Sequence, residues 1–135
     1  MAYIVQTLSA GEELRSRFRL HWSCHTWLYL TALLTVGSAG ILSPLLIFEW
    51  LRLRSIEMGV TTRRVIHKRG IIGRSTQEMR LEAVEAVEMS QGAWGRLLGR
   101  GTVRVYGRGT SDVVFRAVRQ PLEVKRAIEA AVSLV

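Results

Sequence analysis

The sequence predicts a mainly β fold, a small barrel or sandwich with a C-terminal α-helix, into which a membrane helix or short helical hairpin is inserted. Most of the chain alternates apolar and polar residues in short stretches separated by glycine or polar turns, which is typical of strands. Residues 26–48 contain no Asp, Glu, Lys, Arg or His, and such a run is too long for an ordinary core helix. Residues 121–133 have helical spacing instead.

The length and the charge balance limit what the chain can be. Its 135 residues suffice for one domain. We expect a strand segment at 1–22 that belongs to the sheet, a membrane segment at 23–54, and the main domain at 55–135. Nineteen Lys and Arg against eleven Asp and Glu give a net charge of +8, which favours anionic partners. The soluble part offers few aromatics, so anionic membrane lipids are expected as partners and nucleic acid is not.

A strand with one basic face is predicted at residues 14–22, after a lead at 1–10 that has no clear period. Every second residue from Leu14 to Trp22 is expected to face the core, and the intervening arginines and His21 to face away. A membrane-surface helix would not place its arginines at even spacing, so we prefer the strand.

Two shapes fit the apolar segment. A single helix over residues 27–53 would reach about 40 Å and could cross a bilayer with tilt. A hairpin bending at Gly37–Gly40 has arms of only about 20 Å, short of the ~30 Å hydrocarbon core. Length favours the single span. However, strands on both sides must join one sheet, and arginines flank both ends, so topology favours a hairpin that inserts without fully crossing.

Tryptophans border the segment, with Trp22 and Trp27 at one end and Trp50 at the other. Indole rings favour the headgroup level, so we predict these three residues as membrane-interface anchors. Because basic flanks tend to stay on the cytoplasmic side, we expect the protein at the cell membrane with its soluble domain facing the cytoplasm.

The remainder of the main domain is predicted to be short strands followed by one helix. A glycine-bounded insert at 92–101 has room for one or two helical turns, and the last hairpin turns at 107–112. Pro121 suits a first helical position, and an apolar stripe marks one face of the following helix. That helix must plug a barrel or pack across a sandwich. The predicted strands are 55–60, 64–69, 75–81, 87–91, 102–106 and 113–117, and the stripe is Leu122, Val124, Ala127, Ile128, Ala131 and Val132.

Several motifs together resemble those of one family. The run from Gly59 to Ile72, the segment from Leu81 to Gln91 and the GRLLGRGTV stretch at Gly95–Val103 are similar to signatures of bacterial pleckstrin-homology-like membrane proteins of the bPH2 type. The segment Leu8–Glu13 and the pair His21–Trp22 look like the motifs that precede the membrane helices in that family. The resemblance covers nearly the whole chain in the right order.

The resemblance implies a membrane hairpin attached to a pleckstrin-like barrel with a C-terminal helix. Two features depart from the family pattern. The membrane insert is shorter than the usual two-helix hairpin, and Arg100 stands where the family has an aromatic residue.

No catalytic chemistry is evident, and we expect neither an enzyme nor a cofactor. The chain contains no nucleophile elbow, phosphate loop or paired-carboxylate motif. His21, Cys24 and His25 lie close in sequence, but a fourth metal ligand is not apparent, so no metal site is predicted. As the only cysteine, Cys24 cannot form an intrachain disulfide.

A basic cluster is the best candidate for contact with lipid. Arg64 and Lys68 share strand parity, Arg63 lies at the preceding turn, and Arg69 ends the strand. Each basic residue near an anionic surface contributes about 1 kcal/mol. We therefore predict a membrane-anchored, non-catalytic binding or scaffold module whose cluster contacts anionic headgroups.

The alternative is an assembly protein that forms a homo-oligomer, or binds another membrane protein, through its sheet surface. Ile71 and Ile72 in a glycine-bracketed bend, and Trp94 in the insert, are apolar residues expected at the surface. An apolar patch on a membrane-tethered domain can serve as a subunit contact.

Overall fold

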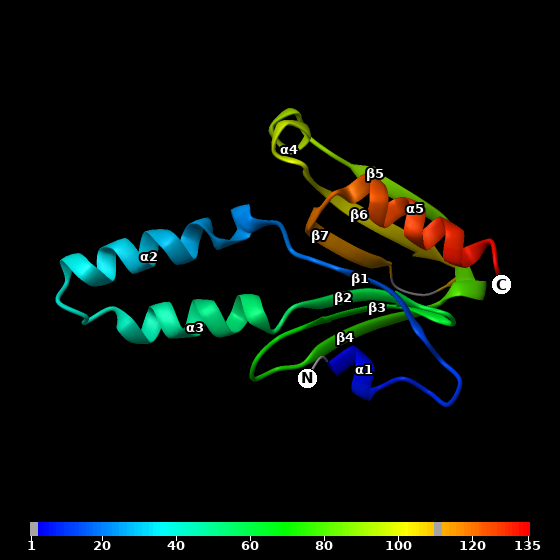
Figure 1. The fold of residues 1–135 in the computed structure, drawn as a ribbon, viewed down its shortest axis with the longest axis horizontal. Coiled ribbons are helices and arrows are strands. Elements are labelled where there is room, and N and C mark those ends of the chain that lie inside the picture. The colour runs from blue at the N-terminus through cyan, green and yellow to red at the C-terminus, as the bar shows by residue number, and fades with distance from the viewer. Residues whose placement is uncertain (1–2, 110–111) are drawn as a thin grey trace.

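A sandwich of two antiparallel sheets carries one helix across it and a long helical hairpin at one end (Figure 1). This computed structural model describes residues 3–109 and 112–135. The first sheet has the order β1-β2-β3-β4 and the second β5-β6-β7. The strands are β1 (Leu14–Phe18), β2 (Glu57–Thr61), β3 (Arg64–Arg69), β4 (Ser75–Arg80), β5 (Val84–Ser90), β6 (Arg100–Gly107) and β7 (Val113–Arg119).

The two sheets join at one corner. Beyond β1 the chain forms a bridge between Leu20 and Val118 of β7, and the His21 amide donates to the carbonyl oxygen of Ala117 at 2.8 Å. No other strand pairing joins the two sheets within the described part of the chain, so the sandwich form of the prediction holds and the closed barrel does not.

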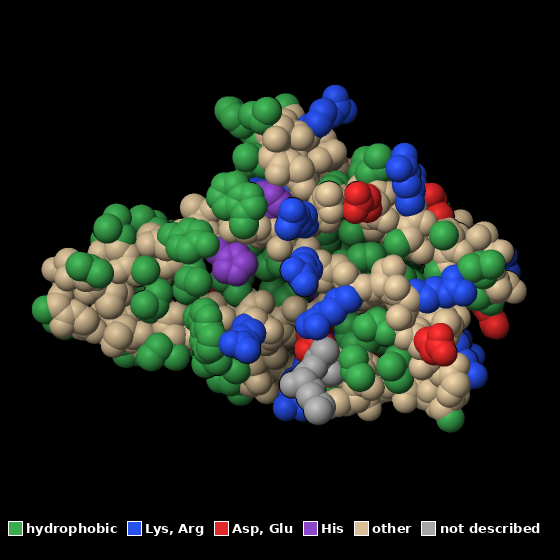
Figure 2. Space-filling view, in the orientation of Figure 1, with side chains coloured by type: hydrophobic (Ala, Val, Ile, Leu, Met, Phe, Trp, Pro, Cys, Tyr) green, Lys and Arg blue, Asp and Glu red, His purple; other side chains and the backbone are tan. Residues whose placement is uncertain are grey.

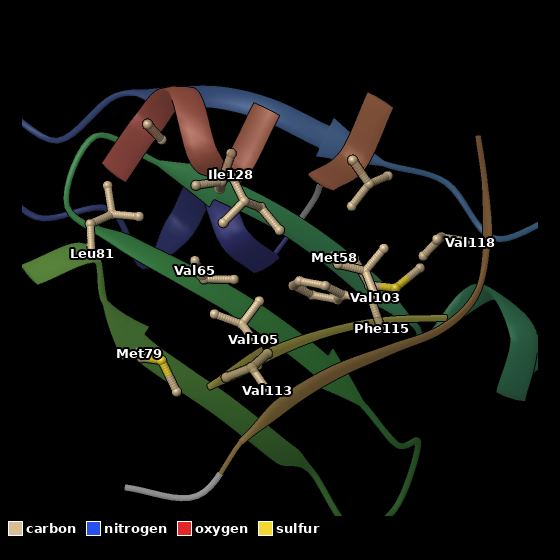
Figure 3. Close-up of a cluster of buried hydrophobic side chains, with 13 residues drawn as sticks. Met58, Val65, Met79, Leu81, Val103, Val105, Val113, Phe115, Val118 and Ile128 are labelled. Atoms are coloured by element: carbon tan, nitrogen blue, oxygen red, sulfur yellow. The ribbon is translucent and has the colours of Figure 1, made fainter. Parts of the chain in front are cut away.

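The core lies between the sheets and beneath α5 (Pro121–Val132) (Figure 3). Phe115 and Val65 are fully buried there, and Val124 and Ile128 of α5 complete it. The predicted stripe is wrong at Leu122, which is 47% exposed, because the buried face instead begins one residue earlier at Pro121.

The predicted alternation of the first strand holds through Leu20 and then reverses. His21 is only 2% exposed and Trp22 is 58% exposed, the opposite of the expected facing. The strand ends before these residues, and a 3₁₀ turn, η1 (Trp22–His25), begins. His21 caps this turn, because its Nδ1 accepts from the Ser23 amide at 3.1 Å.

The N-terminal lead contains a short helix that its sequence did not predict. In α1 (Tyr3–Gln6), the free amides of Tyr3 and Ile4 donate to the Glu57 carboxylate at 3.0 and 3.1 Å. Ile4 is buried over Gly59, where a Cβ would lie 2.9 Å from the Ser16 carbonyl oxygen. The lead thus covers the outer face of the first sheet.

The apolar segment folds as two antiparallel helices, α2 (Thr26–Gly37) and α3 (Ser43–Arg54), so of the two expected shapes the structure has the hairpin. The chain reverses over residues 38–42, where Ala39 and Gly40 adopt φ of 52° and 87°. Within the described residues, no helix has both the length and the apolar character needed to cross a membrane.

The remaining elements lie close to their predicted places. A 3₁₀ turn, η2 (Leu81–Ala83), leads into β5, which begins three residues earlier than expected. The glycine-bounded insert forms α4 (Ala93–Leu98). Of the predicted turn at 107–112, residues 110 and 111 lie outside the described residues.

Candidate functional site

The hairpin returns the chain to the sandwich, so the three predicted tryptophan anchors all border the root of the hairpin or lie in the half of it next to the sandwich. Trp22 and Trp27 lie where α2 begins, and Trp50 lies near the end of α3, beside the sandwich. Their side chains are 58%, 58% and 46% exposed. The Arg54 guanidinium lies 5.1 Å from the Trp50 ring. We call these three tryptophans, which border the root of the hairpin, the tryptophan belt.

Two further apolar tips flank this root. The β3–β4 loop carries Ile72, which is 92% exposed, and lines a hollow together with Phe48 of α3. On the other side, α4 exposes Trp94 and is attached to η1, because His21 Nε2 donates to the Leu98 carbonyl oxygen at 2.8 Å. Ile71, the third predicted contact residue, lies beside Ile72 in the β3–β4 loop and is half-buried.

The glycine-rich motif of the insert explains how α4 is held. A Cβ on Gly95 would lie 2.7 Å from the Arg100 carbonyl oxygen, so only glycine allows the chain to return this closely. Arg100, which departs from the family pattern, donates from Nη1 to Ser23 Oγ at 2.8 Å. The insert is therefore tied to the entrance of the hairpin.

A crevice of about 470 Å³ opens between the hairpin root and the end of the sandwich. Its floor is formed by His67 of β3, whose ring centroid lies 5.5 Å from that of Phe115. One wall is apolar, and the rim carries arginines; Figure 2 shows basic side chains gathered where the hairpin meets the sandwich. The apolar wall is Leu20, Trp27, Leu53, Ile56 and Val114, and the polar lining is Cys24, Glu49, Arg52, His67, Arg69, Gln77 and Arg116.

Part of the polar lining comes from strand positions that face the core elsewhere. Along β3, Val65, His67 and Arg69 share one face, and burial falls from complete at Val65 to exposed at Arg69. In β4, Gln77 is paired with His67 and shares its face with buried Met79. The inner face of this sheet therefore changes from apolar core to polar cleft at its hairpin end.

Arg116 reaches the crevice through an irregularity in β7. The register between β6 and β7 shifts so that Arg116 and Ala117 together oppose Thr102, which is a β-bulge. Ala117 has φ of 52°, a conformation uncommon for a residue other than glycine. Bulges of this kind redirect a side chain, and here Arg116 lines the crevice.

The crevice is positively charged. Three arginines stand against one carboxylate, that of Glu49, which accepts from Arg52 Nη1 at 3.1 Å. Burial, followed by the charge of Arg69, lowers the pKa of His67 below its ordinary 6.5, so the imidazole is neutral at pH 7. Burial likewise raises the pKa of the Cys24 thiol above 9.0. The net positive charge of the crevice therefore comes from its arginines.

The structure separates the predicted basic cluster into two groups. Arg63 and Arg64 lie at one end of β3 and Arg69 at the other, and six strand residues span about 20 Å. Only Arg69 adjoins the hairpin root. Lys68 lies on the outer face with Arg64, as its parity predicts, and its Nζ is 3.9 Å from the centroid of the Tyr3 ring. The four residues therefore do not form one patch.

Arg64 is held within the protein. Its Nη2 and Nε donate to both oxygens of Glu12, at 2.7 and 2.9 Å, and its Nη1 donates to Glu78 Oε2 at 2.7 Å. Thr61 Oγ1 donates to Glu12 at 2.6 Å. Arg64, through these bonds, lowers the pKa of Glu12 from 4.5 to about 2. The Leu8–Glu13 motif and the motif that follows Gly59 are thus parts of one ionic network, in which Glu12 is buried.

Of the crevice lining, sequence reasoning named only Trp27 and Arg69 as site residues, and it missed His67 and Arg116 among others. Strand parity places His67 on the same face as Val65 and could have identified it. Arg116 could not be found in this way, because a bulge interrupts the alternation. Across residues 3–109 and 112–135, no group of three or more His, Cys, Asp or Glu side chains is arranged to hold a metal ion.

Comparison with family models gives one match. A family described as the bacterial PH domain matches residues 9–132, which is most of the chain and includes the hairpin. Comparisons with curated proteins and with solved structures give no match.

Proposed function

Because the chain belongs to the bacterial PH domain family, we propose that it is a non-catalytic binding module held by its hairpin at the cytoplasmic face of the cell membrane. Membership of this family supports a binding or scaffold role. The observation that carries the membrane attachment is the surface of the hairpin. Among residues 3–109 and 112–135, 12 of the 21 exposed large hydrophobic side chains lie on residues 26–54.

An exposed apolar surface of this size is expected to be buried against lipid or another protein. Leu33, Val36 and Ile41 are 70%, 82% and 80% exposed, and they lie toward the tip of the hairpin, away from the sandwich (Figures 1 and 2). Both helices are apolar on several faces, which is typical of segments buried in a core or in lipid. Hydrocarbon chains of a bilayer supply such a cover.

The dimensions support insertion from one side. Each helix has 12 residues, and at 1.5 Å per residue this gives about 18 Å, somewhat more than half of a ~30 Å hydrocarbon core. The hairpin then ends near the middle of the bilayer while the belt of Trp22, Trp27 and Trp50 lies at the headgroup level. The exposed tips Ile72 and Trp94 face the same level.

Membrane binding is tested by flotation of the purified full chain with vesicles of phosphatidylcholine and phosphatidylglycerol. We expect the protein to float with the vesicles and the variant Val36→Asp/Ile41→Asp to lose at least about 90% of that binding, since a charge at bilayer depth costs about 2.5–3.5 kcal/mol. Leu134→Asp is the matched control, because Leu134 is 67% exposed at the opposite end of the molecule.

Equal flotation of Val36→Asp/Ile41→Asp and the wild type would refute the anchor. Circular dichroism checks that the variant keeps its fold, and we expect that it does, because these two side chains are exposed and contact no core residue.

A homo-oligomer is the second candidate, since Ile72 and Trp94 are exposed apolar residues. Their position beside the hairpin root favours lipid as the surface they meet. Mass determination of the full chain in detergent distinguishes contact with lipid from contact between subunits.

A further inference from the structure

We propose that the crevice between the hairpin root and the sandwich binds a single anionic phospholipid, its phosphate at Arg69 and Arg116 and its acyl chain along α3. This inference rests on the proposed membrane attachment and adds a specific site to it. A lipid held in this crevice is distinct from the layer of lipid that surrounds the hairpin.

The first step concerns the two arginines. Neither Arg69 nor Arg116 belongs to an ion pair among the described residues, whereas Arg64 has two carboxylate partners and Arg52 has one. Arginine presents donors in a fixed fork that matches a phosphate group. The bulge at Ala117 brings Arg116 to the crevice that Arg69 also lines. Two unpaired arginines from different sheets therefore converge on one hollow.

The second step concerns the inner faces of the strands. His67 and Gln77 occupy core-facing positions at the hairpin end of their strands. Apolar residues at these positions would extend the core, but both side chains are polar. A neutral imidazole and an amide both offer hydrogen bonds without adding charge. Together with the arginines they suit a phosphodiester and its polar substituent.

The third step concerns the apolar wall. Trp27, Leu53 and Ile56 line the crevice on the hairpin side. A second hollow of about 570 Å³ shares Arg52, Ile56 and Arg69 with the crevice and continues past Phe48 and Ile72. The two hollows therefore adjoin, and the apolar side chains of Ile56, Phe48 and Ile72 form a path along them beside α3. Such a path suits an acyl chain and has no role for a free phosphate.

The size and depth agree with this ligand. A volume of about 470 Å³ lies within the roughly 300–1,000 Å³ of ligand pockets. The crevice adjoins the tryptophan belt, so the proposed attachment puts it at the depth of phospholipid headgroups.

Cys24 provides the test, because it lines the crevice and is the only cysteine of the chain. The rate of its alkylation by N-ethylmaleimide is measured at fixed pH on the full chain in a neutral detergent. The three additions are phosphatidylglycerol, phosphatidylcholine and glycerol 3-phosphate. We expect phosphatidylglycerol at saturation to slow alkylation about fivefold or more, and the other two to leave it unchanged.

The variant Arg69→Gln/Arg116→Gln should lose this protection, and Arg63→Gln/Arg119→Gln is the control that removes two exposed arginines outside the crevice. Rates with and without lipid are compared within each variant, so a change in the intrinsic reactivity of the thiol cancels.

Each other outcome overturns the proposal. Equal protection by phosphatidylcholine would remove the anionic site, and equal protection by glycerol 3-phosphate would indicate a site for soluble phosphates. Protection that survives Arg69→Gln/Arg116→Gln would show that these arginines do not hold the headgroup. The failure of the hairpin anchor is read separately, from flotation of Val36→Asp/Ile41→Asp, which leaves the crevice residues in place.

Discussion

The two ends of β3 use arginine in opposite ways. At the end far from the hairpin, Arg64 is bound by Glu12 and Glu78 within a network that closes the N-terminal segment over the sheet. At the hairpin end, Arg69 faces an open crevice with no carboxylate partner among the described residues. Whether an arginine on this strand stabilises the fold or is free to bind a ligand depends on the carboxylates near it. Its position on the strand alone does not reveal this.

The largest expected effect separates these two ends by stability. Arg64→Met leaves the buried Glu12 carboxylate unpaired and should lower the free energy of unfolding by about 3 kcal/mol, whereas the exposed Arg69→Met should change it by less than about 0.5 kcal/mol. Urea unfolding of the full chain in detergent, followed by near-ultraviolet circular dichroism, measures both. Similar losses for the two variants would remove the distinction.

The next effect concerns acid. Because the pKa of Glu12 is about 2 when folded and 4.5 ordinarily, its carboxylate stabilises the fold fully above about pH 4.5 and loses this contribution as the pH falls toward 2. Glu12→Gln should therefore flatten the dependence of stability on pH within that interval. Unfolding measured from pH 7 to pH 3 tests it. An unchanged slope in Glu12→Gln would show that another carboxylate causes the acid sensitivity.

A smaller effect is expected at the flanking tips. Trp94→Asp and Ile72→Asp should each weaken binding to phosphatidylglycerol-containing vesicles by about tenfold or less, which corresponds to ~1.4 kcal/mol. Leu122→Asp on α5 is the control, because Leu122 is an exposed apolar residue outside the hairpin root. Flotation measures all three, and equal losses at Leu122 and Trp94 would mean that the tips do not contact lipid.

The smallest expected effect is on mass. If the tips meet lipid and do not join subunits, Ile71→Asp should leave the mass of the protein in detergent unchanged. Light scattering of wild type and variant gives the answer. A larger assembly that Ile71→Asp reduces would favour the oligomer.

Much of the fold could be predicted from the sequence, because alternation and helical spacing are local properties. The strand beginning at Leu14, the helix beginning at Pro121 and the small helix around Trp94 all lie where their patterns indicate. The hairpin was favoured because strands on both sides of residues 26–48 had to meet and because arginines flank both ends of the segment. The length of the segment alone indicated a single spanning helix.

The candidate site was less predictable, because its geometry depends on distant partners. His21 is buried since Leu98, 77 residues away, accepts its hydrogen bond. Arg64 was expected at a lipid surface, yet its partner Glu12 lies 52 residues earlier in the chain, before the first strand. The crevice itself arises where β3, β7 and the hairpin root converge, and Arg116 enters it through a bulge. None of these relations is visible in a local pattern.

The insertion of the hairpin between β1 and β2 has a consequence for the order of folding. The connection between these paired strands is 38 residues long, over positions 19–56. Closing a flexible loop of that length costs about 2 kcal/mol more than closing one of four residues. During synthesis, residues 26–54 are complete before any strand after β1 exists. A hairpin formed at that stage returns the chain to β1, so that β2 begins beside its partner as it emerges.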